Sequence, residues 1–117
     1  MIILTVRMTV GPRNRAAVLS VIRPMLGPTS VETGCAGCHA SVDLDDDNVL
    51  TFSEEWDTQE NLDRHVRSDG FRNLLSVLDL ASDPPEVRIH TVTEARGMEV
   101  VQAARRPQEG MGGHAGV

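Results

Sequence analysis

The chain has 117 residues, of which 40% are hydrophobic and 24% are charged, and this size and balance are those of one globular domain. Its formal net charge is −6 and only 3% of its residues are aromatic, so a basic, base-stacking surface for nucleic acid is not expected. No segment approaches the roughly 20 apolar residues of a membrane span, and no basic leader precedes the apolar N-terminus. We therefore expect a cytoplasmic protein with reduced cysteines and neither a nucleic-acid nor a membrane partner.

The first third of the chain predicts a strand followed by a helix. Residues 2–10 alternate between apolar and polar side chains, which is typical of a half-buried strand. Gly11 and Pro12 end this strand, and Pro12 suits the first turn of a helix. Apolar residues then recur at intervals of three and four, which predicts an amphipathic helix that ends near Gly27 and Pro28.

The middle of the chain predicts a hairpin and two helices. Residues 38–44 and 49–56 favour strands on either side of an acidic turn. Asp57 or Thr58 can cap a short helix whose inner side carries Leu62, His65 and Val66. A second helix, capped by Ser68 or Asp69, has an apolar stripe made of the following residues: Phe71, Leu74, Leu75 and Leu78.

Residues 86–95 predict a last strand, because β-branched residues predominate there. The resulting order, β-α-β-β-α-α-β, predicts an α+β, ferredoxin-like split βαβ domain with an antiparallel sheet and its helices on one face. We assign residues 1–96 to this domain and residues 97–117 to a C-terminal extension. The extension can start with a strand or a short helix, and its Gly-rich end is expected to be disordered.

Cys35, Cys38 and His39 form a C-x-x-C-H pattern, which is typical of covalent haem attachment. Haem of this type is attached after export, and no export signal is visible. Three neighbouring ligands are also one fewer than a structural zinc site requires. We expect no haem and no metal, with Cys38 pointing inward from its strand and Cys35 in the loop before it, while a reversible disulfide stays open as an alternative.

Residues 52–78, FSEEWDTQENLDRHVRSDGFRNLLSVL, resemble the antibiotic biosynthesis monooxygenase family, which includes quinol monooxygenases and lies within the dimeric α+β barrel superfamily. The resemblance is carried by a strand that ends in Glu54-x-Trp56, by a capped helix with an inward His65, and by the sequence SDGF before a second amphipathic helix. A Gly-Cys pair at residues 34–35 also resembles the start of the family's second strand.

The resemblance implies a homodimer whose sheets form a barrel, with a pocket between sheet and helices in each subunit. It also implies the transfer of one oxygen atom from O2 to a phenol or quinol without metal, flavin or haem. His65 is then the catalytic base, since its ordinary pKa suits proton removal near neutral pH. We predict that the substrate contacts the following residues: Phe52, Trp56, Phe71 and Leu75.

Three other interpretations remain open. His65 can be a core residue that is hydrogen-bonded to its surroundings, and Trp56 can be a packing anchor. The same scaffold can serve as a non-catalytic, dimeric ligand-binding or stress-associated module. Finally, Cys35 and Cys38 can act as a thiol redox pair.

Overall fold

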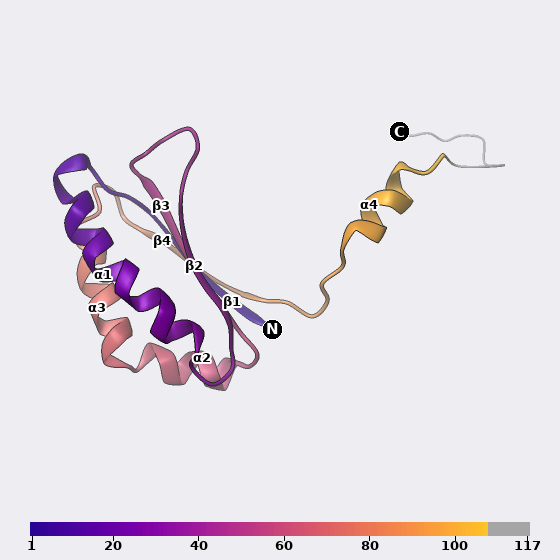
Figure 1. Cartoon of the computed structure of the whole chain (residues 1–117), viewed down its shortest axis with the longest axis horizontal. Coiled ribbons are helices and arrows are strands. Elements are labelled where there is room, and N and C mark those ends of the chain that lie inside the picture. Colours follow the sequence, from indigo (N-terminus) through magenta and orange to yellow (C-terminus); the bar gives the residue numbers. More distant parts are fainter. Residues whose placement is uncertain (108–117) are drawn as a thin grey trace.

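The computed structural model describes residues 1–107, which form one antiparallel sheet with three helices on one of its faces (Figure 1). The strands have the order β2-β3-β1-β4 in the sheet, and every neighbouring pair is antiparallel. The elements are β1 (Ile2–Thr9), α1 (Pro12–Ser30), β2 (Cys35–Val42), β3 (Val49–Trp56), α2 (Gln59–Val66), α3 (Asp69–Leu78), β4 (Glu86–Thr91) and α4 (Met98–Arg105). The α+β, ferredoxin-like fold expected from the sequence is confirmed, and the sheet is open, with β2 and β4 at its edges.

The core lies between the sheet and helices α1, α2 and α3. Strand β1 places alternate residues on the covered face, and each of these is at most 7% exposed. Its neighbour β3 does the same, because cross-strand partners such as Val6 and Phe52 share a face of the sheet. The core residues of these two strands are Ile2, Leu4, Val6, Met8, Leu50, Phe52 and Trp56.

Helix α1 continues to Ser30, so the prediction that it ends near Gly27 and Pro28 was wrong. Its buried stripe, which keeps the helix on the sheet to its last turn, consists of Val18, Ile22, Met25 and Thr29. Pro24 and Pro28 are exposed on the outer side, four residues apart. Each lacks an amide hydrogen, so the carbonyl groups of Ser20 and Pro24 lose their usual partners within the helix. Packing of the inner face therefore outweighs the local cost of two prolines.

Strand β2 begins at Cys35 and ends at Val42, three and two residues earlier than predicted. A register shift between Cys35 and Gly37 marks a bulge in its pairing with β3. Leu44, which the alternation placed on the apolar face, lies in the hairpin turn and is fully exposed. The strand therefore starts within the loop that the sequence predicted, and its outer end leaves the core.

Helices α2 and α3 have the predicted positions, with Thr58 and Ser68 as their N-caps. The hydroxyl of Thr58 accepts a hydrogen bond from the amide of Asn61, so it is Thr58, not Asp57, that caps α2. Val66 and Leu75 are 39% and 49% exposed, respectively. Their predicted inward positions were wrong, because the buried stripe of α3 consists of Phe71, Leu74 and Val77 and turns Leu75 outward.

Strand β4 ends at Thr91, earlier than the predicted residue 95, and all six of its residues are exposed. After it, residues 98–105 form α4, which resolves the choice between a strand and a helix in favour of the helix. The helix stands away from the body of the domain (Figure 1). The tail that we expect to be disordered lies, from residue 108 on, outside the described residues. Within residues 1–107, no helix is long and apolar enough to cross a membrane.

Candidate functional site

The most unusual feature of the core is a buried histidine between two carboxylates. His65 on α2 is 1% exposed, and Glu54 on β3 is completely buried. Nε2 of His65 lies 2.8 Å from Oε2 of Glu54, within hydrogen-bond geometry. Nδ1 of His65 lies 2.9 Å from Oε2 of Glu32, which follows α1 and is partly exposed. A buried carboxylate is costly unless it is paired, so Glu54 and His65 stabilise each other inside the core.

The tryptophan of the Glu-x-Trp sequence orients this pair. Trp56 and Glu54 are two residues apart on β3, so both side chains lie on the covered face of the sheet. Nε1 of Trp56 donates a hydrogen bond of 3.0 Å to Oε1 of Glu54. The ring of Trp56 also lies 4.9 Å from that of His65, and Phe71 meets the imidazole edge-on at 5.6 Å. The imidazole is therefore held from three sides.

The pairing decides which nitrogen of His65 is available for chemistry. Because Glu54 accepts the proton of Nε2, the neutral imidazole carries its lone pair on Nδ1. Nδ1 lies 2.9 Å from Oε2 of Glu32, so a protonated imidazole is paired with a carboxylate on this side as well. A neutral His65 would thus present a basic nitrogen on the Glu32 side.

The carboxylates also change the proton affinity of His65. Burial lowers the pKa of the imidazole, but the hydrogen bonds and negative charges of Glu54 and Glu32 outweigh it and raise the pKa above 6.5. His65 is therefore a stronger base than an exposed histidine, and it becomes neutral only at a higher pH.

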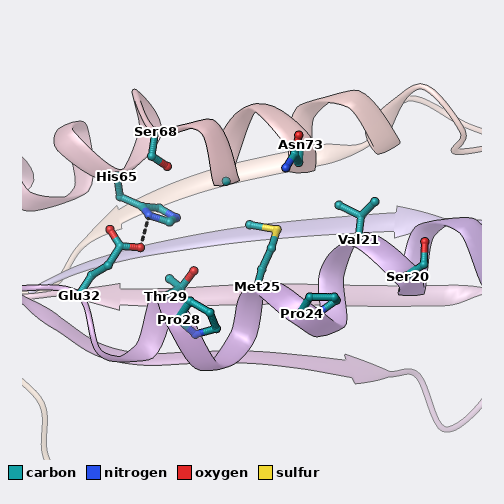
Figure 2. Close-up of a pocket in the computed structure, with 11 residues that line it drawn as sticks. Ser20, Val21, Pro24, Met25, Pro28, Thr29, Glu32, His65, Ser68 and Asn73 are labelled. Carbon is teal, nitrogen blue, oxygen red and sulfur yellow. Dashed lines mark ion pairs between the residues drawn. The ribbon is translucent and has the colours of Figure 1, made fainter.

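A cleft of about 500 Å³ lies on the outer side of this pair, between α1 and the α2–α3 segment (Figure 2). It is lined by Ser20, Val21, Pro24, Met25, Pro28, Thr29, Glu32, His65, Ser68, Gly70 and Asn73. The two prolines lie in its α1 wall, so the helix carbonyl groups that they leave without partners belong to the same wall. The cleft therefore combines an apolar wall with hydrogen-bond acceptors and an acidic, histidine-bearing end.

Of the predicted site residues, only His65 lines this cleft. Phe52 and Trp56 are fully buried in the core, and Phe71 is buried against the ring of His65. Leu75 is exposed and lies outside the lining of this cleft, so the view that it belongs to the core was wrong. This cleft lies between helices, whereas a smaller cavity of about 180 Å³ lies where the pocket was expected, between α1 and strands β2 and β3 of the sheet.

Glu32 and Glu54 were missed as partners of His65. A signal for Glu54 was present, because a glutamate stands among apolar residues at inward positions of β3. A charged residue in that phase requires a buried partner. Glu32 gives no such signal, since it follows a helix whose end was predicted too early.

The two cysteines lie beside this site as free thiols. Cys38 is buried, as predicted, and Cys35 lies at the start of β2, hydrogen-bonded to the carbonyl of Gly37. Burial, with smaller contributions from nearby carboxylates, raises the pKa of Cys38 to about 12 and raises that of Cys35 as well. Both directions disfavour rapid thiolate chemistry. Within the described part of the chain, no three His, Cys, Asp or Glu residues are arranged to hold a metal ion.

Known proteins of the same fold share this architecture. Rv0793 from Mycobacterium tuberculosis is 23% identical, with a TM-score of 0.74 over 82% of this chain and 98% of its own. A candidate antibiotic biosynthesis monooxygenase from Deinococcus radiodurans is 18% identical, with a TM-score of 0.75 over 83% and 97%. A conserved protein from Methanosarcina mazei Go1 is 26% identical, with a TM-score of 0.70 over 76% and 89%. No curated protein sequence matches this chain. The model of the antibiotic biosynthesis monooxygenase family matches residues 1–75, so the chain belongs to that family.

Proposed function

We propose that the protein is a monooxygenase that oxidises a small phenol or quinol with O2, without a bound cofactor, and that the substrate lies in the cleft beside His65. The observation that carries the proposal is the buried imidazole of His65 in the cleft wall, which lies between Oε2 of Glu54 at 2.8 Å and Oε2 of Glu32 at 2.9 Å. Family membership supports a monooxygenase, and the site supplies the base that such a reaction needs.

The reaction starts with the transfer of the phenolic proton to Nδ1 of His65. The resulting imidazolium is stabilised by Glu54 on one side and by Glu32 on the other. The phenolate is electron-rich enough to pass an electron to O2, after which a carbon–oxygen bond forms at a ring C–H carbon. The O–O bond then breaks, and that carbon and the phenolic carbon become carbonyl groups. The second oxygen atom leaves with two hydrogens as water, so phenol and O2 give quinone and water.

The proposal does not include direct substrate contacts by the four predicted residues, Phe52, Trp56, Phe71 and Leu75. Two of them act through other side chains. Trp56 fixes Glu54, and Phe71 fixes the ring of His65. Phe52 is only 1% exposed, so a substrate could reach it only if the core opened. We therefore treat His65 as the catalytic residue and Trp56 as a positioning residue.

The decisive experiment measures oxygen consumption with a panel of hydroquinones. His65→Gln keeps a donor for Glu54 but removes the base, and we expect turnover to fall by about 100- to 10,000-fold. His90→Gln is the matched control, because His90 is exposed on β4, and its turnover should equal that of the wild type. Unchanged turnover in His65→Gln would refute the proposed base.

The pH dependence tests the role of Glu54. The base form of His65 exists above its raised pKa, so the rate should rise through a pH above 6.5. Glu54→Gln removes a negative charge that raises the pKa of His65. The pH at which the rate rises should therefore be lower in this variant, even if its maximal rate falls. Glu55→Gln, next to it but on the opposite face of the sheet, should leave that pH at the wild-type value. If the rate rises at the same pH in the wild type, Glu54→Gln and Glu55→Gln, His65 is not the titrating base.

The alternative is a non-catalytic ligand-binding module, and the raised pKa of His65 favours it. At a pH below that pKa, the imidazole is protonated and offers no lone pair, so the cleft can bind a ligand without reaction. A quinol that raises the melting temperature without any oxygen uptake between pH 6 and 9 would support this module over the enzyme. A thiol redox protein is less favoured, because both thiols have raised pKa values.

We propose further that the protein acts in the cytoplasm as a homodimer. The sheet face without helices carries Ile3, which is half-buried, among Thr and Ser residues. Val92 is also half-buried, whereas Val49 is already covered within the chain. Light scattering at micromolar concentration tests this proposal, and a stable monomer would contradict it.

A further inference from the structure

On the helix side of the sheet, the edge strand β4 has apolar residues that the helices do not cover. In the pairing of β1 with β4, Leu4 lies opposite Ile89 and Val6 lies opposite Val87. Cross-strand partners share a face, so all four side chains point to the helix side of the sheet. Leu4 and Val6 are each 1% exposed, whereas Val87 and Ile89 are 52% and 54% exposed. We call these two exposed residues the β4 strip.

Helix α4 also has an uncovered apolar side, because none of its residues is buried by other parts of residues 1–107. Met98 and Val101 are 65% and 51% exposed. Val100 and Ala104 extend this apolar side, while Glu99 and Gln102 lie on the other. A helix of eight residues is marginal in water unless its apolar side is covered. The described chain therefore contains an uncovered strip and an unpacked helix.

We propose that α4 packs on the β4 strip of a second copy of this chain, and that the two copies exchange these helices reciprocally. The inference rests on the proposed homodimer, and it adds a contact on the helix side of β4 to the one proposed for the helix-free face of the sheet. A two-fold pair buries the contact twice, since each chain gives its helix and receives the other. Each β4 strip then gains the helix cover that β1 obtains within its own chain.

The path of the chain favours exchange over packing within one chain. Val92 donates its amide to the carbonyl of Met1 at 2.8 Å, so the pairing of β1 with β4 continues to residue 92. Beyond it the chain does not turn back, and it carries α4 away from the sheet (Figure 1). The radius of gyration is 18.7 Å, against about 13 Å for a compact domain of this length. The projecting helix therefore lies where a second molecule can receive it.

Charge favours the same pairing. Arg105 and Arg106 are at the C-terminal end of α4, and Asp83 and Glu86 are exposed at the start of β4. A helix that lies antiparallel to β4 over the strip would bring these opposite charges together. Such exposed pairs contribute little to affinity, but they select one direction of packing.

Cross-linking distinguishes exchange from packing within one chain. We would combine Ile89→Cys and Val101→Cys in a chain that also carries Cys35→Ala and Cys38→Ala, and then oxidise it. Exchange predicts a covalent species at twice the 12.7 kDa of one chain. A disulfide within a single chain, or free thiols, would overturn the inference. Leu44→Cys with Val101→Cys is the control and should not cross-link, because Leu44 lies at the far hairpin turn.

Hydrogen exchange on the wild-type chain provides a test that needs no cysteine replacement. Amides of residues 98–105 should be protected, and this protection should be lost on dilution or in Ile89→Asp. Leu44→Asp is the matched control and should keep it. Light scattering on the same samples separates the two proposals. A dimer whose α4 amides are unprotected would refute helix exchange but not the homodimer. A monomer would refute both proposals.

Discussion

Strands β1 and β4 are neighbours in the same sheet, with apolar residues in the same phase, yet their burial is opposite. Leu4 is almost inaccessible, whereas its cross-strand partner Ile89 is more than half exposed. The difference arises outside the strands, because α1, α2 and α3 bury the residues of β1 on that side of the sheet but leave all six residues of β4 exposed. Alternation of apolar and polar residues in a strand therefore shows which face can be buried, and the helices determine whether that face is buried.

The candidate site depends on the covered region. Glu54 is buried because it lies under the helices, and it can remain charged there only because His65 and Trp56 donate hydrogen bonds to it. On β4, His90 and Glu86 are exposed and need no such partners. Burial thus turns an ordinary pair of polar residues into a site with altered proton affinity.

The largest expected effect is the loss of the buried pair. His65→Ala removes the partner of a buried carboxylate, so we expect the free energy of unfolding to fall by about 3–5 kcal/mol. His90→Ala on the uncovered strand should change it by less than about 0.5 kcal/mol. Urea denaturation at pH 7 measures both. Similar small losses for the two variants would mean that Glu54 is not a buried charge.

Leu4 and Ile89 provide a direct test of the comparison. Leu4→Ala creates a cavity in the core, and we expect it to cost about 2–5 kcal/mol at any protein concentration. Ile89→Ala should cost less than about 1 kcal/mol in dilute protein, since that side chain is mostly solvated there. If α4 of a second chain covers Ile89, its cost should grow with protein concentration. Urea denaturation at two protein concentrations measures both losses of unfolding free energy. Equal losses for Leu4→Ala and Ile89→Ala in dilute protein would contradict the difference in burial between β1 and β4.

Much of the fold could be predicted because its signals are local. The alternation in β1 and β3, the caps Thr58 and Ser68, and the stripe of α3 each indicate an element by themselves. The errors arise where packing overrides local chemistry. Pro28 is a helix breaker by propensity, but the buried Thr29 next to it keeps α1 on the sheet.

The site could be predicted only in part, for the same reason. His65 was found because helical spacing and the family pattern both place it inward. Its environment depends on contacts between distant segments, since Glu32 and Glu54 are 33 and 11 positions away. No local pattern specifies that both carboxylates meet one imidazole. Likewise, Leu75 fits an apolar stripe in sequence, and only the position of α3 on the body of the domain turns it outward.

The pH dependence of stability tests the direction of the pKa shift of the buried histidine. The pKa of His65 in the folded chain is raised above its unfolded value of about 6.5. The stability gained from protonated His65 is therefore fully present below about pH 6.5 and is lost as the pH rises through the folded pKa. The stability advantage of the wild type over His65→Gln should thus shrink from pH 5.5 to pH 8.5 in urea denaturation. An advantage of the wild type that grows as the pH rises would contradict the direction of the shift.

The smallest expected effect compares a helix that covers the core with the one that does not. The hydroxyl of Thr58 caps α2, whereas Gly97 precedes α4 without a side-chain cap. Thr58→Ala should lower the free energy of unfolding by about 1 kcal/mol, because α2 is part of the cooperative core. Gly97→Asn adds a capping side chain to α4 but should leave the unfolding of a dilute chain unchanged, because α4 contributes no buried residue to that core. If α4 packs on a second chain, Gly97→Asn should instead strengthen association, which sedimentation equilibrium measures. A rise in the stability of the dilute monomer would mean that α4 belongs to the core of its own chain.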